Sequence, residues 1–205
     1  MLHRFNGRYQ EAKEMLQEVF AAYVMIYGEH HPSTINSLVN LGAVHKDLQE
    51  FDIAAKLYEK AIEGRRVTEG ENSVNYAMSL AMAAGAYREV ENYSTADKYL
   101  KDAYMIIAME HGEENMSCSA ILNSMGLNYK RQNKFERSVD AYDRSLKIRE
   151  ELLGEDHPDS LSTRHNLAEL YISWNKPEQA QELLNLNVEL MEKKNKEQKE
   201  AAKEA

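Results

Sequence analysis

Apolar positions recur along the chain in two alternating sets, and both sets return every 42 residues. The first set combines a leucine, a small residue and a ring at steps of four and three residues, as in Leu38, Gly42 and His45. Such steps bring side chains to one face of an α-helix. Each unit therefore begins with an amphipathic helix, which we predict over residues 32–48, 74–90, 116–132 and 158–174.

The second set combines an aromatic, a small and a bulky residue at helical steps, as in Phe51, Ala54 and Tyr58. This set predicts second helices over residues 9–27, 52–68, 94–110, 136–152 and 178–194. Small residues on both helices let the two backbones approach closely, which favours an antiparallel helical hairpin. A hairpin alone does not bury its apolar faces, so the hairpins are expected to stack into an all-α solenoid.

The connectors between hairpins contain a repeated glycine and, at two places, a proline. The glycines are spaced by 42 residues and comprise Gly28, Gly70, Gly112 and Gly154. Glycine readily adopts the left-handed conformation that ends a helix, and proline is tolerated in the first turn of the next one, here at Pro32 and Pro158. His157 precedes such a proline, so we expect it to cap or pack against the helix start.

The pattern divides the chain into one solenoid over 1–194 and a charged tail over 195–205. The solenoid consists of a partial first repeat, 1–27, and full repeats over 32–68, 74–110, 116–152 and 158–194. The helix over 9–27 lacks most of its partner and exposes apolar side chains such as Met15 and Val19 unless something covers them. We expect this end to continue in a longer precursor or to dock against another subunit, and the tail to form a solvated, frayed helix.

The segment Leu-x-x-Leu-Gly-x-x-His at 38–45, continued by Ala54, Tyr58 and Ala61, resembles the tetratricopeptide repeat signature. The 42-residue spacing and the segment GEDHPDSLSTRHNLAELY at 154–171 are similar to the kinesin light chain type of this repeat. The resemblance implies a right-handed superhelix with the first helices inside and the second helices outside. Arg164 and Asn187 depart from it, because they replace a leucine and a small residue of the pattern.

No long heptad segment of the kind that joins a motor light chain to its heavy chain is found in this sequence. We therefore carry over the fold and the mode of binding, but not the motor association. In the resembled family, a partner peptide lies along the concave surface formed by the first helices. Transferred by position, the candidate groove residues are Asn36, Asn40, Lys46, Met78, Met82, Arg88, Asn123, Lys130, Arg131, His165 and Asn166.

Each kind of groove residue also has a structural interpretation. The amides of Asn40 and Asn166 can pair with a peptide backbone, but asparagine also tolerates a half-exposed helix face. The cations Lys46, Arg88, Lys130 and Arg131 can receive an acidic peptide, or they offset the helix macrodipole. Met78 and Met82 suit an adaptable apolar pocket, or they fill irregular core.

Composition narrows the classes of partner. The chain has 34 acidic and 25 basic side chains and a formal charge of -9, which disfavours nucleic acid. No apolar run is long enough for a membrane span, so membrane insertion is not expected. A single cysteine, Cys118, excludes an intrachain disulfide framework and fits an intracellular site, cytoplasmic or mitochondrial.

Catalytic and metal-binding patterns are weak. His30 and His31 are adjacent on a connector, which is not the spacing of a metal-binding helix face, and Cys118 is expected to be a packing residue. We expect no cofactor. The leading function is a non-enzymatic scaffold or adaptor whose groove binds a partner segment, and the basic groove residues favour an acidic one. The alternative is a permanent accessory subunit or assembly factor of a large complex that docks through its N-terminal end and outer face, with a mitochondrial complex as one option. An enzyme ranks third.

Overall fold

The computed structural model describes residues 8–204, with side chains to residue 200, and every secondary-structure element in that range is a helix. The elements in chain order are α2 (Tyr9–Tyr27), α3 (Pro32–Asp47), α4 (Phe51–Glu69), α5 (Val74–Glu89), α6 (Tyr93–His111), α7 (Met116–Arg131), α8 (Phe135–Leu153), α9 (Pro158–Ser173) and α10 (Pro177–Glu204). The predicted helices and the all-α class are confirmed. The part of the first repeat predicted before residue 8 lies outside the described residues.

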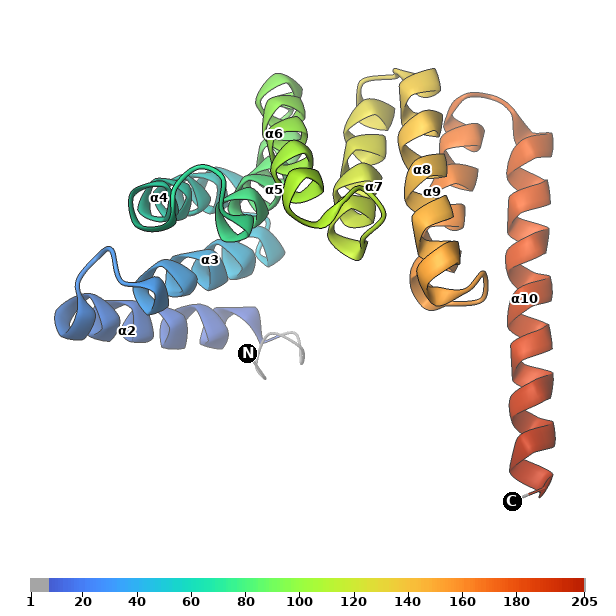
Figure 1. The fold of residues 1–205 in the computed structure, drawn as a ribbon, viewed down its shortest axis with the longest axis horizontal. Coiled ribbons are helices and arrows are strands. Elements are labelled where there is room, and N and C mark those ends of the chain that lie inside the picture. Colours follow the sequence, from blue (N-terminus) through green and yellow to red (C-terminus); the bar gives the residue numbers. More distant parts are fainter. Residues whose placement is uncertain (1–7, 205) are drawn as a thin grey trace. The chain divides into compact units, whose positions relative to one another are not determined.

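The chain forms two compact units, an N-terminal unit that ends at Glu110 and a C-terminal unit that begins at His111. In the N-terminal unit, α3 packs against α2 and α4, and α4 packs against α5 (Figure 1). In the C-terminal unit, α7 packs against α8, α8 against α9, and α9 against α10. Each unit is thus a stack of antiparallel hairpins. A single solenoid over 1–194 stays a prediction.

The connector glycines have positive φ, as predicted, but their ψ differs from that of a left-handed helix. Gly28 has φ 84° and ψ 168°, and Gly154 has φ 96° and ψ 157°. This region of the backbone map is open essentially to glycine alone. The requirement for glycine is therefore stricter than a left-handed helical cap would impose.

Helix starts are capped by side chains. The imidazole Nδ1 of His157 accepts a hydrogen bond from the backbone N–H of Asp159 at 3.2 Å. His31 accepts one from Ser33 in the same way, also at 3.2 Å. The capping role expected for His157 is confirmed. The chain motif His-Pro therefore works as a cap followed by a first-turn proline.

The two helices of a hairpin meet where glycine faces tyrosine. A Cβ added to Gly42 would lie 2.7 Å from the ring of Tyr58, and one added to Gly126 would lie 2.7 Å from the ring of Tyr142. Both rings are fully buried. The other two hairpins carry the pairs Ala84 with Leu100 and Ala168 with Leu184 at the same positions. A smaller residue in the first helix thus accompanies a larger one in the second.

The two departures from the repeat pattern lie together in the C-terminal unit. Arg164 is only 2% exposed, and its guanidinium donates to Asn187 Oδ1 at 2.8 Å and to the carboxylate of Glu150. Asn187 in turn donates to the carbonyl of Leu161 at 3.0 Å. Because a buried charge needs partners, the asparagine and the glutamate explain how an arginine is tolerated at a leucine position.

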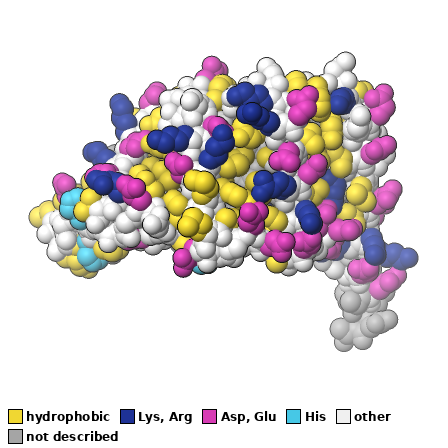
Figure 2. Space-filling view, turned by 45° about the horizontal axis from the view of Figure 1, so that its top comes forward, with side chains coloured by type: hydrophobic (Ala, Val, Ile, Leu, Met, Phe, Trp, Pro, Cys, Tyr) yellow, Lys and Arg dark blue, Asp and Glu magenta, His cyan; other side chains and the backbone are white. Residues whose placement is uncertain are grey.

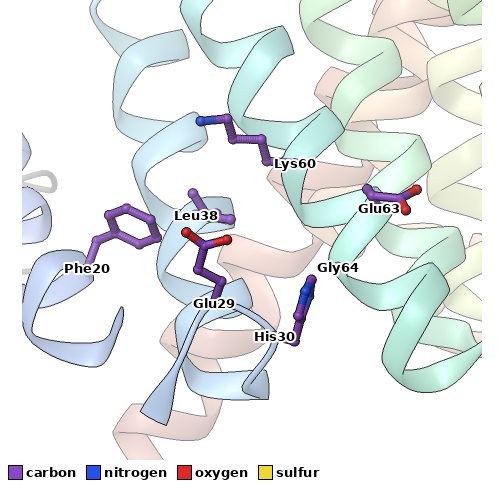
Figure 3. A pocket seen from close by; sticks show the side chains of 7 residues that line it. All are labelled: Phe20, Glu29, His30, Leu38, Lys60, Glu63 and Gly64. Carbon is purple, nitrogen blue, oxygen red and sulfur yellow. The ribbon is translucent and has the colours of Figure 1, made fainter. Parts of the chain in front are cut away.

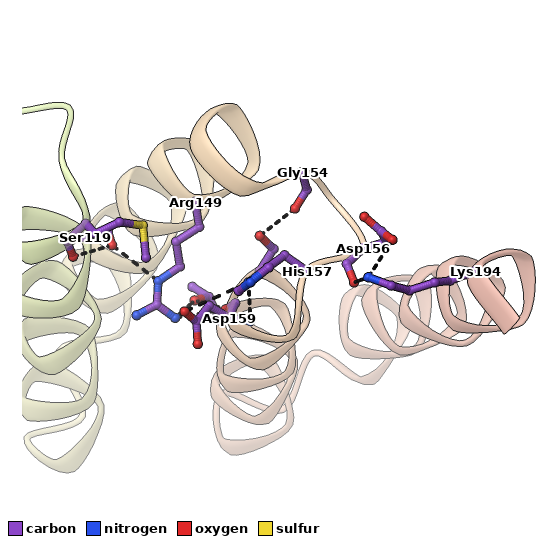
Figure 4. Close-up of polar contacts among 10 residues, drawn as sticks. Ser119, Arg149, Gly154, Asp156, His157, Asp159 and Lys194 are labelled. Atoms are coloured by element: carbon purple, nitrogen blue, oxygen red, sulfur yellow. Dashed lines mark hydrogen bonds and ion pairs between the residues drawn. The ribbon is translucent and has the colours of Figure 1, made fainter. Parts of the chain in front are cut away.

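A second buried arginine joins three helices of the C-terminal unit. Arg149 of α8 donates to the carbonyl of Asp159 at 2.9 Å and to the hydroxyl of Thr163 at 2.7 Å, both in α9, and reaches Ser119 of α7 at 3.4 Å (Figure 4). In the N-terminal unit, Arg65 of α4 donates to the carbonyl of Asn75 in α5. These guanidinium groups fix a hairpin to the first turns of the next one.

Candidate functional site

The candidate groove residues of the C-terminal unit lie on α7 and α9, and two of them contact each other. The amide nitrogen of Asn166 donates to Oδ1 of Asn123 at 3.1 Å. The two helices are neighbouring first helices of the repeat, so these amides face the same surface. The structure thus brings together two of the predicted groove residues.

An ion pair lies on the same two helices. The ammonium of Lys130 is 2.9 Å from Oε2 of Glu169, and Nε2 of His165 is 3.5 Å from the other carboxylate oxygen. The hydrogen bond from Lys130 is the main cause that lowers the pKa of Glu169 below its usual value. Lys130 is therefore already paired, and an acidic ligand must compete with Glu169 for it. Arg131 is exposed.

The candidate groove residues of the N-terminal unit lie on α3 and α5 and are more apolar. Met78 is 39% exposed and Met82 is half-buried. Gly85 has open space where a Cβ would stand. These features fit the adaptable apolar surface that the sequence suggested for α5.

The polar candidates of the N-terminal unit differ in their burial and in their contacts within the protein. Oδ1 of Asn36 accepts a hydrogen bond from the buried Arg65 at 2.8 Å, so this amide already has a partner within the protein. Asn40 is half-buried and Lys46 is exposed. Arg88 is half-buried with its Nε 3.4 Å from Glu89. The prediction that the cations of the groove receive an acidic peptide stays a prediction.

A polar cluster that the sequence did not indicate lies in the N-terminal unit. Glu59 of α4 accepts hydrogen bonds from the hydroxyls of Tyr87 at 2.8 Å and Tyr99 at 2.6 Å. Burial, followed by the carboxylate of Glu59, raises the pKa of Tyr87 to about 12. The cluster ties α4 to α5 and α6. Tyr87 lies at the same repeat position as His45, where the pattern has a ring, but nothing in the sequence pattern singles out Tyr99.

An aromatic cluster of the C-terminal unit was also missed. Trp174 stacks on Phe135 with a centroid separation of 5.4 Å, and the ammonium of Lys176 lies 3.3 Å from the centre of a Trp174 ring. The cluster closes the turn between α9 and α10. The single tryptophan of the chain was visible in the sequence, but its contacts depend on the turn geometry.

The described residues offer little for catalysis. No group of three or more His, Cys, Asp or Glu side chains in this part of the chain is arranged to hold a metal ion. Cys118 is buried in α7, and burial raises the pKa of its thiol, which opposes formation of a nucleophilic thiolate. None of the described helices is sufficiently long and apolar to cross a membrane. Figure 2 shows acidic, basic and hydrophobic side chains interspersed on one face.

Comparison with known proteins links the repeat to one family. A family model described as tetratricopeptide repeat matches residues 1–66, 36–106 and 117–193. The Arabidopsis thaliana protein KINESIN LIGHT CHAIN-RELATED 3 is 29% identical over 149 residues, which are 72% of this chain and 22% of that protein. A clustered mitochondria protein homologue of Xenopus tropicalis is 29% identical over 97 residues, which are 46% of this chain and 8% of that protein.

The fold is also similar to solved structures. BtubC (BKLC) from P. vanneervenii superposes with a TM-score of 0.79 at 20% sequence identity, covering 95% of this chain and 77% of that one. At this identity the likeness concerns the fold alone. The chain spans about a fifth of the length of the plant relative and less than a tenth of that of the frog relative.

Proposed function

The chain belongs to the tetratricopeptide repeat family, with repeats of the kinesin light chain type, and we propose that it is a non-enzymatic scaffold that binds a partner segment on its first helices. Members of this family mediate protein–protein interactions. The observation that carries the proposal is the polar surface of α7 and α9, where Asn123 and Asn166 lie beside the ion pair of Lys130 and Glu169.

This surface suits an extended peptide with an acidic residue. The hydrogen bond between Asn123 and Asn166 uses one donor and one acceptor, which leaves amide groups for a peptide backbone. An acidic side chain of the peptide would replace Glu169 on Lys130. While no peptide is bound, Glu169 pairs with Lys130, so the cation has a partner on the empty surface.

Charge-neutralising variants test this proposal. Lys130→Gln removes the cation and should weaken binding, whereas Glu169→Gln removes the competing carboxylate and should strengthen it. Each change is expected to alter affinity by roughly 1.4-fold to fivefold, since exposed ion pairs contribute about 0.2–1 kcal/mol. Lys147→Gln is a matched control, because Lys147 pairs with Glu151 on the outer helix α8.

The experiment is affinity purification of the tagged protein from its own cells, with mass spectrometry at low and high salt. Partners that decrease with Lys130→Gln, increase with Glu169→Gln and ignore Lys147→Gln support the peptide-binding surface. A set of partners that is indifferent to all three variants would argue against it.

A second candidate function is a permanent accessory subunit or assembly factor of a large complex. The similarity to a clustered mitochondria protein homologue is the reason to keep a mitochondrial complex as one option. Exposed apolar side chains on α2, among them Met15 and Ile26, offer a docking surface. One stoichiometric set of subunits that survives high salt would support the accessory subunit, because a buried apolar interface is little screened by salt.

A further inference from the structure

A pocket of about 270 Å³ opens between α2, α3 and α4, on the side of the second helices. Its lining comes from three helices and one connector and comprises Phe20, Glu29, His30, Leu38, Lys60, Glu63 and Gly64 (Figure 3). None of these residues belongs to the first-helix surface described above. The pocket is therefore a separate feature of the N-terminal unit.

The repeat that lines the pocket lacks a large side chain that the following repeats have. At the position of Gly64, the following repeats carry Ile106, Ile148 and Leu190. A Cβ added to Gly64 would lie 2.9 Å from Cγ1 of Ile35, so the space below the glycine is filled from α3. The next hairpin has the reverse arrangement, with Ala77 and Ile106 at these two positions. The exchange keeps the core filled but leaves the surface above Gly64 hollow.

The chemistry of the pocket is an apolar wall with a carboxylate at its edge. Phe20 and Leu38 form the wall, and Figure 3 shows the carboxylate of Glu29 directed toward Leu38. Within the described part of the chain, Glu29 has neither a hydrogen bond nor an ion pair. Glu63 is occupied by Arg66, at 2.7 and 2.8 Å. The side chain of Lys60 extends away from Gly64 (Figure 3).

We propose that this pocket binds a lysine or arginine side chain of a partner protein. The aliphatic stem of such a side chain lies against Phe20 and Leu38, and its cation pairs with Glu29. An acidic side chain would be repelled by the carboxylate of Glu29, and a purely apolar one would gain nothing from it. The negative charge of Glu29 therefore favours a basic side chain of the partner.

The surroundings of the pocket fit a partner that extends beyond one side chain. The last turns of the two helices that frame it carry Met25, which is 87% exposed, and Val67, which is 56% exposed. Exposed apolar side chains beside a binding pocket are typical of protein-interaction surfaces. The segment that supplies the basic anchor therefore has apolar residues next to it.

The pocket can be tested with three probes that share one stem. The n-butylammonium ion reproduces the end of a lysine side chain, n-butanol lacks its charge, and butyrate has the opposite charge. Binding is followed by amide resonances of the 15N-labelled protein, with Gly64 as the reporter inside the pocket. We expect saturable shifts in the millimolar range for n-butylammonium, roughly threefold weaker binding of n-butanol, and no saturable shift with butyrate.

Two variants and one control complete the test. Glu29→Gln should reduce the affinity for n-butylammonium to that for n-butanol. The double variant Ile35→Ala/Gly64→Ile transplants the pair of the next hairpin, which fills the pocket and should abolish binding of both probes. Glu71→Gln changes the equivalent glutamate of the next connector and should have no effect. Circular dichroism verifies that each variant is folded.

Three results would overturn the proposal. The first is no saturable shift of Gly64 with n-butylammonium up to about 100 mM, well above the weak affinities of fragments of this size. The second is binding of butyrate as tight as that of n-butylammonium. The third is a Glu29→Gln variant that binds n-butylammonium like the parent protein. Because no residue of α7 or α9 is changed, these results leave the proposed peptide-binding surface untouched.

Discussion

Replacement of Gly42 by alanine should destabilise the protein, although alanine is the better helix former. The added Cβ would lie 2.7 Å from Cε1 of Tyr58, whereas carbon atoms in contact are ordinarily about 3.5–4.0 Å apart. Tyr58 is fully buried, so its ring has little room to retreat. Overpacking of this kind costs about 1–3 kcal/mol, and the gain in helix propensity offsets about 1 kcal/mol of it. We expect a net loss of about 1 kcal/mol.

The same substitution should become stabilising once the ring is removed. In a Tyr58→Leu background, the pair becomes alanine with leucine, as at Ala84 and Leu100 of the next hairpin. Gly42→Ala then gains helix propensity without the clash, about 1 kcal/mol. The two backgrounds therefore differ by about 2 kcal/mol, which is within the range of coupling energies between contacting residues.

The assay is urea unfolding followed by far-ultraviolet circular dichroism for the parent, both single variants and the double variant. Gly85→Ala is the control, because nothing lies within 4 Å of the Cβ it would add, and it should stabilise by up to about 1 kcal/mol. The slopes of the four transitions must agree for the free energies to be compared. Equal destabilisation by Gly42→Ala in both backgrounds would refute the contact with Tyr58 as the cause.

Three further predictions concern other parts of the chain. Gly154→Ala should lower the free energy of unfolding by about 1–3 kcal/mol in urea titrations, since φ 96° with ψ 157° is strained for alanine. Glu150→Ala should cost about 3 kcal/mol, because it leaves the buried guanidinium of Arg164 without its carboxylate, and Glu150→Gln should cost less. In an absorbance titration, Tyr87 should ionise near a pKa of about 12 and lower in a Glu59→Gln variant. Because this pKa is raised on folding, its contribution to stability is complete below about pH 10 and is lost as the pH rises toward 12.

The helices could be predicted from the sequence because the repeat samples each position several times. A column such as Leu38, Leu80 and Leu122 fixes a helical face even where one repeat departs from it. The left-handed residues Gln49 and Glu91, with φ of 60° and 61°, escaped prediction because their residue types do not mark this conformation. At the equivalent position, Asn133 and Asn175 are more usual.

The contacts of the candidate site could not be read from an alignment of the repeats. Neighbouring first helices contact each other at sequence separations that differ from the period of 42 residues. Lys130 pairs with Glu169, 39 residues away, and Asn166 pairs with Asn123, 43 residues away. Alignment at the repeat period therefore groups residues that are equivalent, not residues that touch. The pairing of Lys130, which decides how an acidic ligand binds, depends on the packing of α7 against α9.

In a hairpin, a large side chain on one helix can make up for a small one on the other. This exchange explains why a surface pocket can occur in one repeat and not in its neighbours. Stacking requires only that each hairpin fill its share of the core, and the chain meets this with Ile35 and Gly64 in one hairpin and with Ala77 and Ile106 in the next. Moving bulk from the second helix to the first leaves the core filled but hollows the outer surface in that repeat alone. Positions where a repeat exchanges large and small residues therefore mark places where its surface differs from that of its neighbours. In this chain, the pocket above Gly64 is such a place.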